Sequence, residues 1–415
     1  MKAGIITIGD ELLIGQVIDS NSAWIGQFLG DKGIHVSRKI TVSDKAEEII
    51  YSIDQLKDET DLILMTGGLG PTRDDITKKT IAEYLGVGME FHQPTWDRIC
   101  KIFERWGRST TPEHRSQCYM PENITLLANK MGTAPGMMFK AGNCTIVSMP
   151  GVPYEMKYIM EHGVSDLIKE LLPDNNLIFR TIKTVGEGES RISAQIEDII
   201  DGFPDYISIA FLPSLGQVRL RITAAGDAPD KAKMVDHYVD EISTRLGDLV
   251  FGYDNDTLES VIGQLCQKNN WKLGLAESCT GGNISYRIVQ VPGSSSYFEG
   301  GIVAYSYELK QKLLGVKEST LNSYGAVSGE TALEMLNGVT ARLDVDAAIA
   351  ITGIAGPGGG TDEKPVGTVW IAYGDKNEQH TYLLKSGKDR VRNITYSGTY
   401  ALNLLRKFLI GKENP

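Results

Sequence analysis

The sequence lacks the features that mark several large classes of protein. Its five cysteines are scattered and contain no C-x-x-C pair. This argues against a disulfide framework or a zinc ribbon and is typical of a reducing compartment. The histidines form no H-x-x-x-H pattern, so a zincin-type hydrolase is not expected. Neither G-x-x-x-x-G-K-[ST] nor a strand-bounded G-x-G-x-x-G occurs, which disfavours Walker ATPases and Rossmann dehydrogenases.

Basic charge and long apolar runs are also scarce. Lysine and arginine number 42 against 53 aspartate and glutamate, a net charge of −11, so no overall field attracts nucleic acid, and nucleic-acid binding is not expected. No apolar stretch reaches the roughly 18 residues of a membrane span. The apolar run at the N-terminus is short and meets Asp10 and Glu11, unlike a signal peptide. We expect a cytoplasmic protein without a membrane partner.

The 415 residues are enough for more than one domain, since a domain usually has roughly 100–200. Residues 1–172 alternate short apolar runs with helical periodicity, which predicts a parallel sheet covered by helices. Residues 173–254 read as a small α+β unit, with 8 basic and 14 acidic residues. Residues 255–415 alternate again. The predicted fold class is α/β: two three-layer α/β domains with mainly parallel sheets, joined by a small α+β (KH-like) middle domain.

A glycine-rich segment, GGLGPTRDD, follows an apolar run in the first predicted domain. Its glycines allow close backbone approach, and its amides, with a helix starting near Asp75, can face an anion. Asp74 and Asp75 suit a divalent cation that bridges carboxylate and phosphate oxygens. Asp10, Glu11 and the PGVP loop at 150–153 are expected at the same sheet edge. The alternative is a simple turn and helix cap.

The run KLGLAES in the last predicted domain ends at Ser278, before Gly-Gly and a helix. This resembles a nucleophile elbow without the G-x-S-x-G pattern, and amides at the start of the helix can hold an oxyanion. No His–Asp pair is suggested nearby. Lys310 can act as the general base if burial lowers its pKa by about 3 units. In the alternatives, Ser278 is only a helix cap, Lys310 belongs to an exposed KQK run, and Ser294 or Ser295 supplies the hydroxyl.

A second glycine-rich segment, TGIAGPGGG, follows the run AIAIT. Its glycines, including Gly353 and Gly356, favour close backbone approach to an anion, and Thr352 can add a hydroxyl. Arg390, at the start of the last predicted helix, can hold a phosphate with two N–H donors. A surface loop without a ligand is the alternative.

These motifs carry a resemblance to a known family over the whole chain. TIGDELLIGQVIDSNS, TGGLGPTRDDIT and MPGVPYEM resemble the molybdopterin-binding-like domain of the CinA family, the competence/damage-inducible proteins. AESCTGG, PGSSSYFEGGIVAYS, GAVS, ITGIAGPGGGTDEKPVGTVWIA and SGKDRVR resemble the nicotinamide-nucleotide amidohydrolase domain of that family. The order of the predicted domains matches as well.

The resemblance implies two hydrolytic activities. The first domain is associated with metal-dependent hydrolysis of ADP-ribose to AMP and ribose 5-phosphate, and the last with conversion of nicotinamide mononucleotide to nicotinate mononucleotide and ammonia, without a cofactor. The implied nucleotide-binding residues are Gly9, Asp10, Glu11, Gly67, Gly68, Gly70, Thr72, Pro150 and Gly151, with Asp74 and Asp75 as metal ligands. The implied amidohydrolase residues are Ser278, Lys310 and Tyr305 in catalysis, and Ser295, Thr352, Gly353, Gly356 and Arg390 around the substrate.

The sequence thus predicts a homodimeric, bifunctional hydrolase that recycles pyridine nucleotides. Both substrates are ribosyl phosphates that arise from the breakdown of NAD. Two alternatives remain: only the amidohydrolase is active, or the chain is a nucleotide-sensing adaptor in competence or recombination. Whether Ser278 or Ser295 attacks also stays open, as does the identity of the metal.

Overall fold

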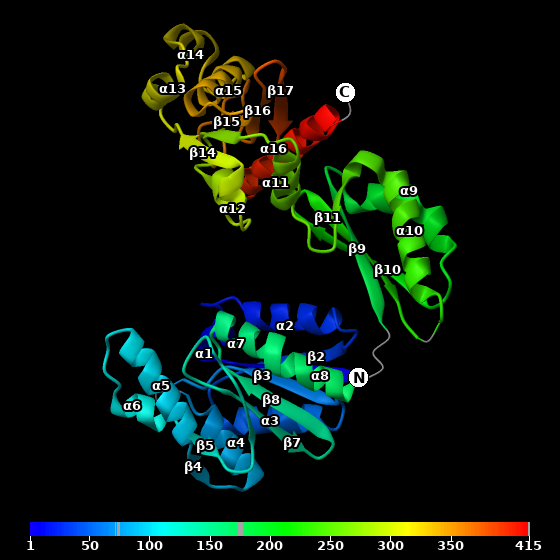
Figure 1. Cartoon of the computed structure of the whole chain (residues 1–415), viewed down its shortest axis with the longest axis vertical. Coiled ribbons are helices and arrows are strands. Elements are labelled where there is room, and N and C mark those ends of the chain that lie inside the picture. Colours follow the sequence, from blue (N-terminus) through cyan, green and yellow to red (C-terminus); the bar gives the residue numbers. More distant parts are fainter. Residues whose placement is uncertain (71, 73–74, 173–176, 227, 414–415) are drawn as a thin grey trace. The chain divides into compact units, whose positions relative to one another are not determined.

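The computed structural model describes residues 1–413 except 71, 73–74, 173–176 and 227 (Figure 1). The chain forms two compact units, Met1–Leu177 and Ile178–Pro415. Among the described helices, none is long and apolar enough to cross a membrane. The predicted domain boundaries at 172/173 and 254/255 stay a prediction.

A six-stranded sheet in the order β2-β1-β3-β8-β7-β6 forms the centre of the first unit. The four strands β2, β1, β3 and β8 run parallel, and β7 and β6 add two antiparallel pairs. The strands are β1 (Lys2–Ile8), β2 (His35–Val42), β3 (Leu62–Thr66), β6 (Thr125–Leu127), β7 (Gly136–Ala141) and β8 (Cys144–Met149). Every residue of β3 and β8 is buried, as expected for parallel strands covered on both faces.

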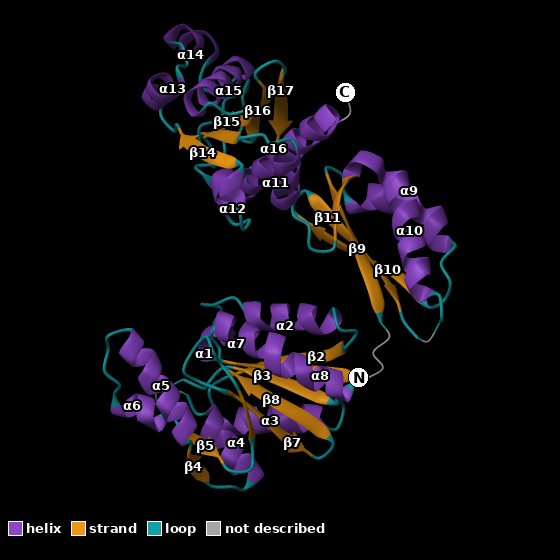
Figure 2. Ribbon diagram, viewed as in Figure 1, coloured by secondary structure: helices purple, strands orange, loops and turns teal. Residues whose placement is uncertain are grey.

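Helices cover both faces of this sheet and make it the middle of three layers (Figure 2). Ile5 of β1 packs with α2, α7 and α8 on one face, and Ile6 packs with α3 and α4 on the other, because successive side chains of a strand point to opposite faces. These helices are α2 (Ser20–Gly30), α3 (Ala46–Lys57), α4 (Thr77–Leu85), α7 (Pro153–Ile159) and α8 (Ser165–Leu171). A π-helical turn, Met160–Val164, joins α7 to α8.

Smaller elements complete the first unit. They are α1 (Asp10–Leu13), the paired strands β4 (Met89–Phe91) and β5 (Tyr119–Pro121), and the helices α5 (Gln93–Arg105) and α6 (Pro112–Ser116). The hydrophobic pattern predicted none of them, because these segments are short or largely exposed.

The second unit begins with a four-stranded antiparallel sheet in the order β10-β11-β9-β12. Its strands are β9 (Ile178–Val185), β10 (Ile207–Ser214), β11 (Gln217–Ala224) and β12 (Val250–Tyr253). The helices α9 (Glu189–Asp201) and α10 (Lys231–Leu246) share one apolar core with the sheet. This is the predicted α+β, KH-like segment.

A five-stranded sheet, β14-β13-β15-β16-β17, follows in the same unit. β14, β13 and β15 run parallel, whereas β16 and β17 are antiparallel. The strands are β13 (Leu273–Glu277), β14 (Phe298–Val303), β15 (Ala347–Gly353), β16 (Thr368–Asp375) and β17 (Gln379–Lys385). β17 was not predicted. The α/β fold class is confirmed, and the parallel strands carry the residues discussed below.

Two groups of helices cover this sheet. One face packs against α11 (Leu258–Lys268), α12 (Asn283–Val289) and α16 (Arg390–Glu413), and the other against α13 (Tyr307–Leu314), α14 (Glu318–Tyr324) and α15 (Gly329–Leu343). Arg406 of α16 is almost fully buried and donates hydrogen bonds to the backbone oxygens of Asp248 and Val250. The last helix is therefore bound to the segment that precedes and begins β12.

Candidate active sites

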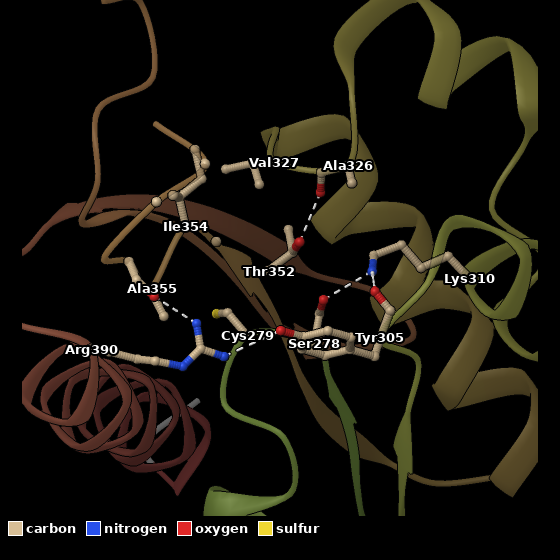
Figure 3. A pocket seen from close by; sticks show the side chains of 14 residues that line it. Ser278, Cys279, Tyr305, Lys310, Ala326, Val327, Thr352, Ile354, Ala355 and Arg390 are labelled. Carbon is tan, nitrogen blue, oxygen red and sulfur yellow. Dashed lines mark hydrogen bonds between the residues drawn. The ribbon is translucent and has the colours of Figure 1, made fainter. Parts of the chain in front are cut away.

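Ser278 lies directly after the buried strand β13, at the carboxyl edge of the five-stranded sheet. Its amide donates to the carbonyl oxygen of Ile351 in β15, which fixes the backbone at the strand end. Gly281 and Gly282 follow with φ of +61° and +96°, conformations that glycine adopts without strain. This tight turn leaves the Ser278 hydroxyl beside Lys310, with 2.9 Å between Oγ and Nζ (Figure 3).

Lys310 is the buried residue at the centre of this site. Only 1% of it is exposed, so the alternative of an exposed KQK run is wrong. Its Nζ also lies 2.8 Å from the carbonyl oxygen of Ala304 and 3.2 Å from that of Tyr305. Burial lowers the pKa of Lys310 from 10.5 to about 8. A neutral amine in this place donates its two hydrogens to the two carbonyls and presents its lone pair to the hydroxyl of Ser278.

The turn after Ser278 is held by a buried carboxylate. Glu277, 1% exposed, accepts hydrogen bonds of 2.7–3.1 Å from the amides of Gly282, Ile284 and Ser285 and from the Ser285 hydroxyl. The expectation that amides at the start of this helix hold an oxyanion is therefore wrong, because Glu277 already occupies them. A buried carboxylate with four donors is well satisfied and rigidifies the turn.

The backbone amides that remain for an oxyanion are those of Cys279 and Thr280. Neither donates to a backbone oxygen within the described part of the chain. The amide after the nucleophile is the usual oxyanion donor of a nucleophile elbow. The Cys279 thiol lines the same cavity, but burial raises its pKa to about 12, which excludes it as a thiolate nucleophile near neutral pH.

The opposite wall of the cavity comes from the end of β15 and the start of α16. The Thr352 hydroxyl donates to the carbonyl oxygen of Ala326, so it braces the wall and keeps only acceptor capacity. Arg390 donates one hydrogen bond to the carbonyl oxygen of Gly356 and one, of 3.2 Å, to the hydroxyl of Tyr305 (Figure 3). The cavity has a volume of about 250 Å³, and its lining includes the predicted residues Ser278, Tyr305, Lys310, Thr352, Gly353, Gly356 and Arg390.

Ser295 lies elsewhere. β14 runs parallel to β13, with Leu273 opposite Phe298, so Ser278 follows the carboxyl ends of these strands and Ser295 precedes the amino end of β14. At about 3.3 Å per residue, the length of β13 separates the two serines by more than about 15 Å. Ser295 is exposed and does not line the cavity. Within this chain Ser295 therefore does not lie at its predicted place in the site, and Ser278 is the serine beside Lys310.

A second cavity, of about 490 Å³, lies at the carboxyl edge of the six-stranded sheet. The predicted residues that line it are Gly9, Asp10, Glu11, Gly67, Gly68, Gly70, Thr72, Asp75, Pro150 and Gly151. Asp74, predicted as a metal ligand, lies outside the described residues. Parallel strands place their loops at one edge, which explains why segments far apart in sequence meet here.

The glycine-rich loop of this cavity needs its glycines. Gly67 has a φ of +121°, and a Cβ there would lie 2.2 Å from the carbonyl oxygen of Ile8. Asp75 accepts hydrogen bonds of 2.5–2.8 Å from the amides of Gly70 and Thr72 and from the Thr72 hydroxyl. Both carboxylate oxygens of Asp75 therefore shape the loop. The helix that follows begins at Thr77, two residues after Asp75, as predicted.

Negative charge collects around this loop. Asp44, which the sequence reading missed, lies in the cavity and accepts a hydrogen bond from the Asp10 amide. Burial raises the pKa of Asp44, and the charges of Asp10, Glu11 and Asp75 raise it further against the lowering effect of that hydrogen bond. Such a group of carboxylates gains from a bound cation.

The donor set fits a divalent cation that is shared with a ligand. No three His, Cys, Asp or Glu side chains converge as a metal-holding group among the described residues. Mg²⁺ often takes only one or two protein carboxylates and completes its shell with water and phosphate oxygens. Asp10, Glu11 and Asp44 can supply those carboxylates.

Glu155 is the other acid that sequence reading missed in this cavity. It is 9% exposed, and Asn129 donates a 2.6 Å hydrogen bond to one of its oxygens. Burial raises its pKa, although Asn129 and Arg98 counteract this. Glu155 belongs to the motif MPGVPYEM, and Asp44 lies just after the second strand. For both acids, the signal that the sequence offered was a position close to the end of a strand.

Three family models match consecutive parts of the chain. The model described as "Probable molybdopterin binding domain" matches residues 4–170, the "Damage-inducible protein CinA KH domain" matches 179–252, and the "CinA C-terminal domain" matches 255–409.

Similar proteins include two relatives that match over nearly the whole chain and one solved structure. A CinA-like protein of Cytophaga hutchinsonii is 40% identical over 408 residues, which cover 98% of each chain. A CinA-like protein of Salinibacter ruber is 37% identical over 410 residues, covering 99% of this chain and all of the relative. The crystal structure of the competence/damage inducible protein CihA from Agrobacterium tumefaciens is 37% identical and covers 36% of this chain and 93% of its own, with a TM-score of 0.36.

Proposed function

The chain belongs to the CinA family over its whole length, and from this premise we propose that its second unit is a serine amidohydrolase that acts on nicotinamide mononucleotide. The products are nicotinate mononucleotide and ammonia. The observation that carries this proposal is the contact between the Ser278 hydroxyl and the buried amine of Lys310, whose other neighbours are two carbonyl oxygens.

The contact supports general-base catalysis by Lys310. With a pKa of about 8, about one tenth of the amine is neutral at pH 7, against about one part in three thousand at 10.5. Because the carbonyl oxygens of Ala304 and Tyr305 accept the two hydrogens of the neutral amine, its lone pair points toward the hydroxyl of Ser278. The proton of Ser278 moves to Nζ as Oγ bonds to the carboxamide carbon of the substrate.

The rest of the reaction follows from the same groups. The tetrahedral oxyanion faces the amides of Cys279 and Thr280, neither of which donates to a backbone oxygen among the described residues. The C–N bond then breaks, and the leaving nitrogen takes the proton from Lys310 and departs as ammonia. A water gives a proton to Lys310 and attacks the acyl-serine, and Ser278 regains its proton as nicotinate mononucleotide leaves.

Recognition of the nucleotide falls to the opposite wall. Arg390 is exposed and keeps N–H donors beyond those used by Gly356 and Tyr305, so it can bind the 5′-phosphate. Tyr305 holds the guanidinium in place from the side of Ser278. Tyr305 is 60% exposed, and its ring offers a surface for the pyridine ring.

The test is direct. The full-length protein is incubated with nicotinamide mononucleotide in the presence and absence of a chelator, and ammonia and nicotinate mononucleotide are measured. We expect equimolar products, independent of the chelator, because no step needs a metal. Absence of both products between pH 7 and 9 would refute the proposal and favour a nucleotide-sensing adaptor.

We propose a second activity for the first unit: hydrolysis of ADP-ribose to AMP and ribose 5-phosphate with a divalent cation. The supporting observation is the cavity that combines a glycine-rich loop with the carboxylates of Asp10, Glu11 and Asp44. The cation, when bound, neutralises the pyrophosphate and polarises it toward attack by water. Glu155 lines the same cavity and burial raises its pKa, so its carboxylate can accept the proton of that water. AMP release that requires added Mg²⁺ or Mn²⁺ is expected, and no release with either ion would leave the amidohydrolase as the only activity.

A further inference from the structure

A third cavity borders the nucleotide cavity of the first unit. It has a volume of about 460 Å³, and both cavities are lined by Gly70, Thr72, Asp75 and Gln117. The two therefore meet at the glycine-rich loop. We call them the carboxylate cavity and the lysine cavity. The proposed hydrolysis uses only the first of them.

The two cavities have opposite charge. The described lining of the carboxylate cavity contains five acids and no lysine or arginine. The lysine cavity is lined by Lys78 and Lys79, and the one acid among its described lining residues, Asp75, accepts hydrogen bonds from the loop. Lys78 is only 8% exposed, and its Nζ donates 2.8 Å to the backbone oxygen of Gln117. No carboxylate forms an ion pair with either lysine in the part of the chain that the structure describes.

The position of these lysines is unfavourable without an anion. Both lie in the first turn of α4, where the helix dipole is positive and no acidic residue is present. The helix also has no side-chain cap. Burying one ammonium and placing a second beside it is costly, and a phosphoryl group would relieve both the charge and the open helix end.

Gln117 marks the boundary between the cavities. The residue is 2% exposed, and its Nε2 donates weakly to the backbone oxygen of Leu69 at 3.4 Å. Its Oε1 has no hydrogen-bond partner among the described residues. Buried carboxamide oxygens are nearly always bonded, so a donor from a ligand, such as a ribose hydroxyl, would complete it.

The geometry points to a two-lobed site for a nucleoside diphosphate ester, in which Lys78 and Lys79 bind the phosphoryl group of the nucleoside half. The pyrophosphate then crosses the loop near Gly70, with its other phosphoryl group and the cation in the carboxylate cavity. Met89 and Tyr119 give the lysine cavity the apolar and aromatic surface on which a nucleobase stacks. This inference rests on the proposed hydrolysis of ADP-ribose, and it assigns the adenylate half of ADP-ribose to the lysine cavity.

Binding measured without metal tests the assignment. The full-length protein, with EDTA present, is titrated calorimetrically with AMP and with ribose 5-phosphate. Lys78→Met and Lys79→Met are compared with Lys101→Met, which removes an exposed lysine of α5 that lines neither cavity. We expect each of the first two variants to weaken AMP binding about tenfold or more and to leave ribose 5-phosphate unchanged, because a charge-assisted hydrogen bond is lost. Lys101→Met should match the parent.

Two results would overturn the inference. The first is AMP binding by both lysine-cavity variants that equals that of the parent, and the second is an equal weakening of ribose 5-phosphate binding. If a thermal melt shows that Lys78→Met is not folded, the test is made with Lys79→Met, since Lys79 is exposed. Lysine-dependent AMP binding by a protein that never cleaves ADP-ribose supports the subsite and refutes only the hydrolysis.

Discussion

Replacing Lys310 with methionine should abolish amidohydrolysis and make the protein more stable at neutral pH. The native pKa of Lys310 is lowered from 10.5 to about 8. That shift of 2.5 units corresponds to about 3 kcal/mol of unfavourable free energy when the buried amine is protonated. The variant also loses the hydrogen bonds from Lys310 to the carbonyl oxygens of Ala304 and Tyr305, and each loss lowers its unfolding free energy by about 1 kcal/mol. A net gain of about 1 kcal/mol in unfolding free energy is therefore expected at pH 7.

The pH dependence separates this reasoning from simple apolar repacking. The pKa of Lys310 is lower in the folded protein than in the unfolded chain, so the protonated amine destabilises the folded parent. This loss of unfolding free energy is complete below about pH 8, decreases between pH 8 and 10.5, and is absent at higher pH. The stability advantage of Lys310→Met should decline over the same interval. The parent's ammonia release should rise with pH through about 8, as the amine becomes the base.

The assays are urea unfolding of parent and variant from pH 6.5 to 10.5 and ammonia release from nicotinamide mononucleotide. Lys312→Met, an exposed position of the same helix, is the matched control and should change neither quantity. Lys310→Arg keeps the positive charge but cannot deprotonate, so it should also be inactive. Substantial turnover by Lys310→Arg, or a stability difference that does not vary with pH, would refute the role of a neutral amine.

Three further outcomes are expected from the same geometry. Ser278→Ala should lose nearly all ammonia release, whereas Ser295→Ala should retain it within about twofold; the reverse would move the nucleophile to the other edge of the sheet. Asp44→Asn should raise the metal concentration needed for AMP release about tenfold and leave ammonia release unchanged, and an unaltered metal titration would remove Asp44 from the ligand set. A fragment 255–415 should melt below the whole second unit, because buried Arg406 loses both backbone acceptors; equal melting temperatures would contradict this.

Strand order and local periodicity were sufficient to predict the sites in outline. Ser278 and the GGLG segment each follow a fully buried strand, and ligand sites lie at the carboxyl ends of parallel strands. The burial of Lys310 was not predictable in this way, because its neighbours in KQK are polar and only the fold turns one lysine inward. Ser295 misled for the opposite reason: proximity along the chain says nothing about which end of a parallel strand a residue occupies.

Two functional details depended on side-chain partners that no local pattern reveals. Glu277 looked like one more polar residue before a turn, yet it takes the amides assigned to an oxyanion. Asp75 was predicted as a metal ligand, but its two oxygens hold the loop to which it belongs. In both positions a carboxylate stabilises the backbone of its own loop. Whether a carboxylate binds a ligand or stabilises its own loop depends on which donors lie within hydrogen-bond distance of its oxygens.

The position of helix α16 in the chain determines when the second unit can finish folding during synthesis. The helix follows the other described elements in the chain, but Ala401, Leu402 and Leu405 are fully buried in the core beneath the five-stranded sheet, and Arg390 lines the pocket. Domains usually fold from the N-terminus as they emerge from the ribosome. Here the first unit can fold early, whereas the pocket around Ser278 stays incomplete until α16 has been synthesised. A premature stop codon before residue 390 would therefore silence the second unit while sparing the first.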